Sequence, residues 1–246
     1  MLNWATVSSL ATGAGTLVLA VATFASVRSA NRAARVAEES LMAALRPLLV
    51  PSQLQDSTQK IFFGDAARVA LPGGCAVAEI GAAAAGTGAA AAETGAAVIY
   101  LAISLRNVGS GIGVLHGWRL ATDWHADQRP APESFRTQQR DLYIPTADLG
   151  FWQAAFRDPA DPQYAAARSL AGTGDVLAID LLYGDYLGGQ RTVSRFLLRR
   201  VGGGEHGGGG QLDGGGELDG GGEQDGGHRW LASVIRHWSI DRADPR

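Results

Sequence analysis

The most regular spacing of reactive side chains lies in a glycine-rich stretch near the C-terminus. Residues 202–227 repeat with a period of six, as GGGEHG, GGGQLD, GGGELD and GGGEQD. Calcium prefers oxygen ligands, and calcium-binding β-rolls also repeat Gly and Asp. Those rolls have a period of nine with an apolar residue in each turn, whereas this stretch has only Leu212 and Leu218. We therefore predict a disordered loop, with a calcium site as the alternative. Its carboxylates are Glu205, Asp213, Glu217, Asp219, Glu223 and Asp225.

The histidines and the single cysteine follow no spacing typical of a catalytic or metal site. There is no HExxH motif, no GxSxG elbow and no Cys/His signature. Cys75 alone excludes an intramolecular disulfide and a cysteine-based metal site, and it is predicted to be a small buried or loop thiol. His237, between Arg236 and Trp238, is expected to be packed or hydrogen-bonded. The other histidines are His116, His125, His206 and His228.

Carboxylates offer no recognisable acid–base pair. Asp123, Asp180 and Asp185 are predicted to lie at strand ends or turns, where Asp is favoured for its turn chemistry. A sugar-hydrolysing pair would need a defined carboxylate separation, which a sequence does not give. We assign no catalytic, cofactor-binding or metal-ligating residue and expect a non-enzymatic protein. The alternative is an enzyme whose site forms only in three dimensions.

Tryptophan and arginine occur together near the C-terminus. Aromatic side chains bury large areas in cores and interfaces, and Trp and Arg are enriched at binding hot spots. The first expectation for these tryptophans is therefore a core position, and a partner-binding surface is the alternative. The candidate partner-binding residues are Trp230, Arg236 and Trp238.

The N-terminus carries the signal for a membrane span. Residues 1–27 contain no charged side chain, and residues 4–27 are continuously apolar or small. A helix needs about 20 such residues to cross a bilayer. Its core is long and no basic residue precedes it, which argues against a cleaved signal peptide. Small residues spaced four apart, Ser9–Gly13 and Ala11–Gly15, also fit close packing of two helices, so a homodimer through the span is the alternative to a monomeric anchor.

Basic residues follow this span and none precedes it. Arg28, Arg32 and Arg35 come directly after it, and short-range Lys/Arg bias places that side in the cytoplasm. We therefore expect a single-pass protein of the inner cell membrane, with its N-terminus outside and the C-terminal domain cytoplasmic. Residues 28–46 are predicted to form a juxtamembrane helix that continues the span and stops at Pro47.

The remainder, residues 47–246, predicts a mainly β domain. Short apolar runs alternate with Gly, Pro, Asp and Asn, a pattern typical of an antiparallel, immunoglobulin-like β-sandwich. Residues 161–170 are expected to be a short helix or an ordered crossover. Low-complexity inserts at 81–97 and 202–227 are predicted to expand hairpin loops. The candidate strands are 48–54, 60–63, 68–71, 97–107, 114–122, 141–144, 151–157, 176–183, 190–201 and 229–240, of which the last also fits a helix face.

Several stretches resemble a group of uncharacterised membrane-anchored bacterial proteins from high-GC lineages. The matching motifs are Leu45-Arg46-Pro47, LRNVGSGIG at 105–113, RDLYIP at 140–145, GFWQAAFRD at 150–158, YGDYLGGQRTVSRF at 183–196 and WLASVIRHWSIDRADPR at 230–246. The resemblance implies one N-terminal span, a short Arg-bearing helix and a β-rich domain. It implies no activity, cofactor or catalytic residue.

These observations predict a membrane-tethered interaction domain on the cytoplasmic face. Its partners would be the bilayer and a protein near the membrane, and the formal net charge of −3 gives no reason to expect nucleic acid. A ligand- or glycan-binding β-sandwich on the outer side is the alternative, and it requires the opposite topology.

Overall fold

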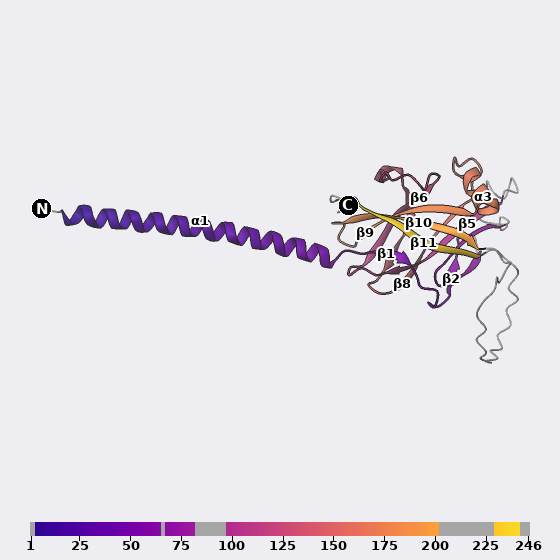
Figure 1. Cartoon of the computed structure of the whole chain (residues 1–246), viewed down its shortest axis with the longest axis horizontal. Helices are drawn as coiled ribbons and strands as arrows, with labels where there is room; N and C mark the ends of the chain where they lie inside the picture. Colours follow the sequence, from indigo (N-terminus) through magenta and orange to yellow (C-terminus); the bar gives the residue numbers. More distant parts are fainter. Residues whose placement is uncertain (1–2, 65–66, 82–96, 202–228, 242–246) are drawn as a thin grey trace, which may run out of the picture. The chain divides into compact units, whose positions relative to one another are not determined.

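The computed structural model describes residues 3–64, 67–81, 97–201 and 229–241, so the acidic glycine repeat and most of the 81–97 insert lie outside the described residues. The chain divides into two units, Met1–Leu45 and Arg46–Arg246. Figure 1 shows a long helix in the first unit and a β-rich second unit.

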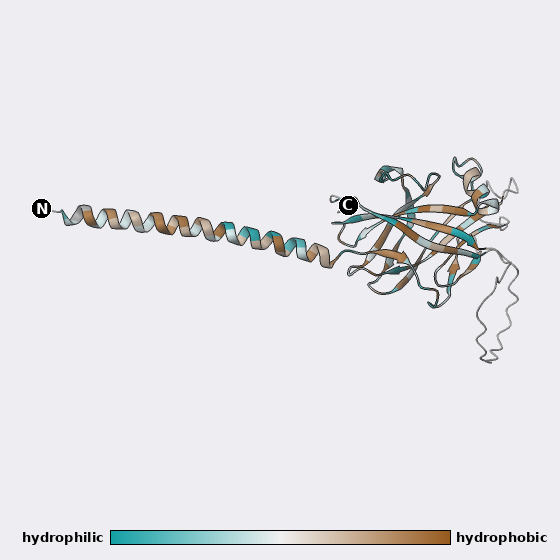
Figure 2. Cartoon of the chain, viewed as in Figure 1, coloured by the Kyte–Doolittle hydropathy of each residue, from teal (hydrophilic) through white to brown (hydrophobic). Residues whose placement is uncertain are grey.

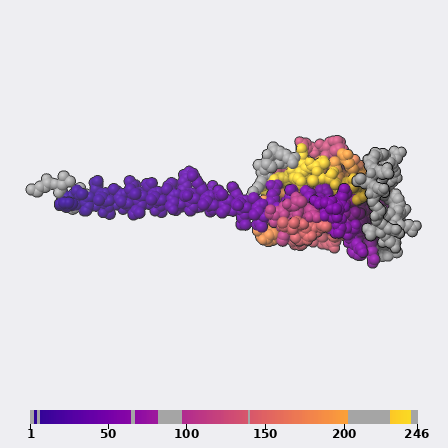
Figure 3. All heavy atoms as spheres, turned by 60° about the horizontal axis from the view of Figure 1, so that its bottom comes forward, coloured from indigo at the N-terminus to yellow at the C-terminus, as the bar shows by residue number. Residues whose placement is uncertain are grey.

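Helix α1, Trp4–Ala44, is continuous over 41 residues. No break separates the predicted span from the predicted juxtamembrane helix. Figure 2 shows its polar residues gathered in the second half, and its described side chains are exposed along most of its length (Figure 3). By length and composition α1 could cross a membrane. The helix ends at Ala44, three residues before Pro47, whose ring nitrogen lacks the N–H that a further turn requires.

Three threonine hydroxyls in the apolar half of α1 are satisfied within the helix. Thr12 donates to the Ser8 carbonyl at 2.9 Å, and Thr23 donates to the Leu19 carbonyl at 2.8 Å. Thr16 makes the same bond to the Thr12 carbonyl. A polar group in hydrocarbon must find its partner inside the protein. These bonds make the threonines compatible with an apolar medium.

The described residues of the second unit form strands, a short α-helix and a 3-10 turn. Val, Ile, Leu and aromatic residues dominate the longer strands, as is usual for strands buried on one or both faces. The strands are β1 Leu49–Pro51, β2 Gln59–Phe62, β3 Arg68–Leu71, β4 Cys75–Gly81, β5 Val98–Asn107, β6 Gly113–Ala121, β7 Arg136–Ile144, β8 Leu149–Phe156, β9 Val176–Asp185, β10 Arg191–Val201 and β11 Arg229–Ser239; α3 is Tyr164–Thr173 and a 3-10 turn covers Pro132–Ser134.

Nine of these strands form one antiparallel sheet, in the order β1-β5-β4-β11-β10-β9-β6-β7, with β8 also paired to β5. The sheet curls strongly. Trp118 on β6 contacts Trp152 and Phe156 on β8, with ring centroids 5.3 and 5.4 Å apart, although β6 and β8 are far apart in this order. The curl wraps the sheet around one large core, to which β1, β4 to β11 and α3 contribute.

Strand β5 lies at the centre of this packing and is buried on both faces. Ile99, Leu101 and Ile103 point into the main core. Tyr100 and Ala102, on the opposite face, pack beneath the β2–β3 hairpin. This second layer brings the end of β2 close to the β8 side of the sheet.

The mainly β, antiparallel prediction is confirmed, and residues 229–240 form a strand rather than a helix. Both inserts join neighbouring antiparallel strands, since β4 pairs with β5 and β10 pairs with β11. The residue-161 region contains a helix, α3. The immunoglobulin-like assignment stays a prediction. One strand, β4, was not predicted, and β7 begins at Arg136 rather than at residue 141.

Candidate functional site

The two ends of the curled sheet meet at a seam between β7 and β8. Among the described residues, β7 pairs only with β6 and β8 only with β5. Side chains bridge the seam instead of a backbone ladder. The Gln138 amide donates to the Gln153 carbonyl at 3.4 Å, and Ile144 packs so closely on Gly150 that an added Cβ would lie 2.6 Å from it.

A large bulge in β7 shapes one wall of this seam. Leu115 pairs with Leu142, and Gly117 pairs with Thr137, so residues 138–141 are left out of the ladder with β6. A Cβ on Gly117 would lie 2.7 Å from the Arg136 carbonyl oxygen, so glycine is needed for this close approach. Bulges are frequent beside functional sites because they redirect side chains.

A pocket of about 930 Å³ lies along the seam. This volume is near the upper end for ligand pockets in proteins. Its described lining contains three arginines, two glutamines, a threonine and aromatic rings, and it contains no carboxylate. The lining residues are Phe62, Phe63, Gly64, Trp118, Arg136, Thr137, Gln138, Arg140, Gln153, Ala154, Ala155 and Arg157.

Arg136 is held in a fixed position at the inner end of the pocket. Its guanidinium lies 5.3 Å from the Trp118 ring and 5.0 Å from the Phe156 ring. It also forms a bidentate pair with Asp161, in which Nη2 donates to Oδ1 at 2.6 Å. That bond raises the pKa of Arg136 and lowers the pKa of Asp161. The pair uses two of the five N–H donors of the guanidinium.

The two glutamines have amides of known orientation. The side-chain Nε2 of Gln138 donates to the main-chain carbonyl of Gln153. The side-chain Nε2 of Gln153 donates to the main-chain carbonyl of Phe62 at 3.3 Å. A carbonyl only accepts, so these bonds place each side-chain oxygen on the other side of its amide. Both oxygens are buried and lack a donor in the described structure. An unpaired buried acceptor costs about 1–3 kcal/mol, which a suitable donor would recover.

No protein-family description, curated protein or solved structure matches this chain. The resemblance to membrane-anchored bacterial proteins therefore stays a prediction. The function of the second unit has to be inferred from its own geometry.

The residues predicted to bind a partner are mostly buried. Trp230 is 3% exposed, belongs to the main core and lies beneath the Arg200 guanidinium. Trp238 is 5% exposed, and its ring lies 5.1 Å from the Arg195 guanidinium and 5.6 Å from the Arg236 guanidinium. The structure thus brings Arg236 and Trp238 together and leaves Trp230 apart, in a packing role. The aromatic rings themselves offer little free surface.

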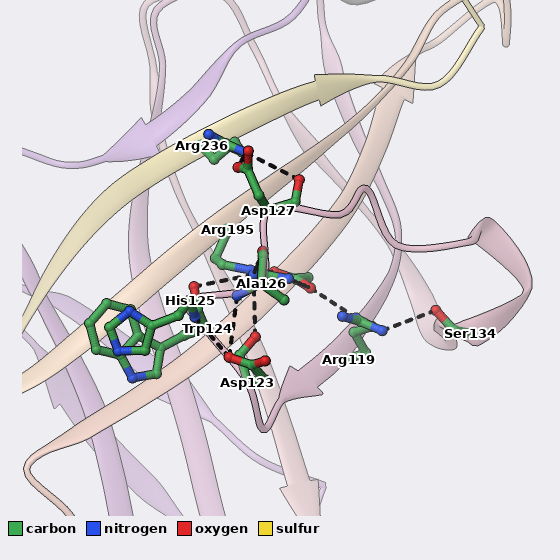
Figure 4. Close-up of polar contacts among 10 residues, drawn as sticks. Arg119, Asp123, Trp124, His125, Ala126, Asp127, Ser134, Arg195 and Arg236 are labelled. Carbon is green, nitrogen blue, oxygen red and sulfur yellow. Dashed lines mark hydrogen bonds and ion pairs between the residues drawn. The ribbon is translucent and has the colours of Figure 1, made fainter.

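A buried ionic cluster includes Arg195, whose guanidinium lies 5.1 Å from the Trp238 ring, and Arg119; Figure 4 shows both arginines. Asp180 is fully buried in the middle of β9, and not at a strand end as predicted. Arg195 donates to both of its oxygens, at 2.7 and 2.9 Å, and Arg119 donates to Oδ2 at 2.8 Å. Arg195 also donates to the Ala126 carbonyl at 2.8 Å. Because these groups satisfy one another, we assign this cluster to stability.

Arg195 fixes the loop that follows β6. Besides Ala126, its Nη1 reaches the carbonyls of Asp123 and Trp124, at 3.4 and 3.3 Å. Arg236 pairs with Asp127 in the same loop (Figure 4). His125 stacks on Trp124 with ring centroids 3.5 Å apart.

A serine–histidine contact also proves to be structural. Ser194 Oγ lies 2.6 Å from His237 Nδ1 and 2.8 Å from the Tyr183 hydroxyl, which accepts from the Leu49 N–H at 3.2 Å. Ser194 and Tyr183 are 0% exposed, so no substrate reaches this hydroxyl. The prediction that His237 is hydrogen-bonded is confirmed, and Cys75 is buried as predicted.

Metal ligands do not gather in the described part of the chain. No three His, Cys, Asp or Glu side chains among those residues are placed to share an ion. Burial, with help from Arg191, lowers the pKa of His116.

The pocket arginines were not identified from the sequence. The only available signal was the alternation of Arg136, Gln138 and Arg140, which places three long polar side chains on one side of an extended strand. Such alternation usually marks a solvated sheet face. The pocket arises only because the curl brings β8 opposite these residues.

Proposed function

We propose that this protein is a membrane-tethered, non-enzymatic interaction domain that binds a protein partner in the seam pocket. Helix α1 supplies the tether. The arginines that follow its apolar half support an orientation with the second unit in the cytoplasm, since short-range basic residues favour that side.

The observation that carries the binding role is the lining of the seam pocket. Arginine, glutamine and threonine donors and an exposed aromatic ring, Phe62, surround a space in which two strand edges lack a ladder. These groups bind and orient a polypeptide surface, and Arg and aromatic residues are enriched at interface hot spots.

Site-specific photo-crosslinking in cells tests this function. A benzophenone amino acid replaces Thr137, which is exposed and lines the pocket, and in a matched control it replaces Arg199, which is exposed on β10. We expect a discrete protein adduct in the membrane fraction from position 137 only. No adduct, or the same adduct from both positions, would overturn the proposal.

A further inference from the structure

We infer that the seam pocket receives an extended, acidic segment of the partner, which adds as a strand along the edge of β8 that faces the seam and has no backbone ladder. This inference rests on the proposed function and specifies its partner chemistry.

The backbone of β8 offers an edge for strand addition. Residues Ile99 to Arg106 of β5 pair with β8 along one side, so the alternate backbone N–H and C=O groups of β8 on its other side face the seam. One of them, the Gln153 carbonyl, accepts from the Gln138 side chain at 3.4 Å, a long bond that an incoming backbone N–H would replace. The bulge at residues 138–141 withdraws that part of β7 from its ladder with β6. An incoming extended chain would supply hydrogen bonds to these groups, as in other cases of strand addition.

The lining residues lie where the side chains of such a segment would fall. Gln153, Ala155 and Arg157 alternate along the end of β8 and the residue after it, and they line the same pocket as Gln138 and Arg140 of β7. Arg140 is exposed, and no ion pair to it occurs among the described residues. Successive side chains of an added strand alternate between faces, so carboxylates at every second position would meet one wall.

The glutamine oxygens favour a peptide over a simple anion. Both oxygens are buried acceptors without donors among the described residues. A phosphate or carboxylate brings only acceptors to a site at neutral pH, apart from any hydroxyl it carries. A peptide brings a backbone N–H at nearly every residue as well as its side chains. Its acidic side chains can therefore accept from the arginines, and its backbone N–H groups can donate to the glutamine oxygens after small rotations of the glutamine side chains.

Selection from a random heptapeptide library displayed on phage tests the inference with the full-length protein in detergent. We expect enrichment of Asp or Glu at alternate positions. The most enriched peptide is then synthesised in four forms: unchanged, with amides in place of its carboxylates, and in two versions with N-methyl groups on either set of alternate backbone nitrogens. Fluorescence anisotropy should show at least tenfold weaker binding for the amide form and for one of the two N-methylated versions.

Two variants and one exchange experiment locate the bound peptide. Arg140→Gln should weaken binding at least fivefold, while Arg199→Gln, an exposed arginine on β10, should leave it unchanged. Circular dichroism confirms that both variants are folded. Bound peptide should slow hydrogen exchange of the β8 amides. Peptides without acidic preference, equal binding to Arg140→Gln, or unchanged exchange in β8 would each overturn the inference.

Inorganic phosphate serves as the small-anion probe. Phosphate that displaces the peptide only at concentrations that raise the ionic strength acts by screening charge, and this result supports strand addition. Phosphate that binds by itself without any peptide binding would show an anion site and overturn the inference. A partner adduct at position 137 combined with failed peptide selection would leave the proposed function standing and remove only its acidic, extended partner segment.

Discussion

At the scale of single residues, the Asn107 side chain bonds to four other residues of the second unit. Its Oδ1 accepts from the N–H groups of Leu48 and Gly109, and its Nδ2 donates to the carbonyls of Gly111 and Ile144. The side chain is fully buried and uses all of its hydrogen-bonding groups. It therefore ties the start of the domain, the β5–β6 loop and the end of β7 together.

Asn107→Asp tests this hub with an almost isosteric change. The new oxygen would face two carbonyls and place a charge in a buried site, so we expect the free energy of unfolding to fall by about 3 kcal/mol. Urea unfolding followed by tryptophan fluorescence, on the full chain in detergent, measures it. Asn31→Asp, at an exposed position on α1, is the control. A loss below about 0.5 kcal/mol would show that the hub has little energetic importance.

The buried cluster around Asp180 gives a second residue-scale prediction. Asp180→Asn removes the negative charge that Arg195 and Arg119 share. Breaking a buried pair leaves an uncompensated charge, and we expect a loss of about 3 kcal/mol in the same unfolding measurement. Asp175→Asn, at an exposed position just before β9, should change little. Equal effects of the two substitutions would contradict a structural role for the cluster.

At the scale of elements, the seam depends on close contact between β7 and β8. Gly150→Ala would place a methyl group 2.6 Å from an Ile144 side-chain carbon. Overpacking of this kind costs about 1–3 kcal/mol. We expect a lower unfolding midpoint and faster hydrogen exchange in β7. Gly64→Ala, where a Cβ meets nothing within 4 Å, is the control. Unchanged exchange in β7 would mean that the seam does not depend on this contact.

Ion pairs between elements determine how the free energy of unfolding changes at low pH. Asp56, Asp161 and Asp241 each accept hydrogen bonds from an arginine, and these bonds are the largest cause of their lowered pKa values. A carboxyl whose pKa is lower in the folded state stabilises the fold above the unfolded pKa of about 3.9, and this contribution is lost as pH falls through the folded pKa.

We therefore expect unfolding free energy to fall as the pH drops below about 4. The double variant Asp161→Asn, Asp241→Asn should lose less stability over that range, because two of the titrating carboxyls are gone. Urea titrations between pH 2 and 6 measure the slopes. If the unfolding free energy of the double variant depends on pH as steeply as that of the unchanged protein, other groups cause the loss of stability in acid. Burial raises the pKa of Glu79, and its contribution has the opposite sign.

Most elements were predictable from local pattern, and the exceptions have physical causes. β3, β6, β9 and β10 combine apolar runs with clear turn residues, so their predicted bounds lie within two residues of the observed ones. β4 was missed because CAVAEIG is rich in alanine, which is disfavoured in strands, and it runs into the Ala/Gly insert. β4 is stabilised by its pairing with β5 and β11, which no local pattern encodes.

The pocket could not be predicted because it depends on long-range geometry. Arg136 and Arg157 line the same pocket only after the whole sheet has curled. The β7 bulge, which turns Gln138 and Arg140 out of the ladder, depends on Gly117 and on the approach of β6 to the Arg136 carbonyl. The burial of Trp230 and Trp238 agrees with the core position expected first for the tryptophans, and their alternative role in partner binding stays a prediction, since amphipathic aromatic residues suit both cores and surfaces.

At the scale of the whole molecule, the proposed orientation can be tested with reporter fusions. With α1 spanning the membrane and the basic side inside, a C-terminal alkaline phosphatase should be inactive and a C-terminal green fluorescent protein should be bright. Moving positive charge to the N-terminal side, by inserting three arginines after Met1 and replacing Arg28, Arg32 and Arg35 with Gln, should reduce this difference. An active phosphatase on the unchanged chain would favour the outward, ligand-binding alternative.

Extraction of membranes with alkaline carbonate tests the tether, on which the rest of the account depends. The unchanged chain should remain in the pellet, because α1 presents an uncharged apolar stretch to the acyl chains. A variant with Leu17→Arg and Leu19→Glu should be released, since charges at the centre of a span cost about 2.5–3.5 kcal/mol each. Release of the unchanged chain by carbonate alone would contradict the membrane-tethered function.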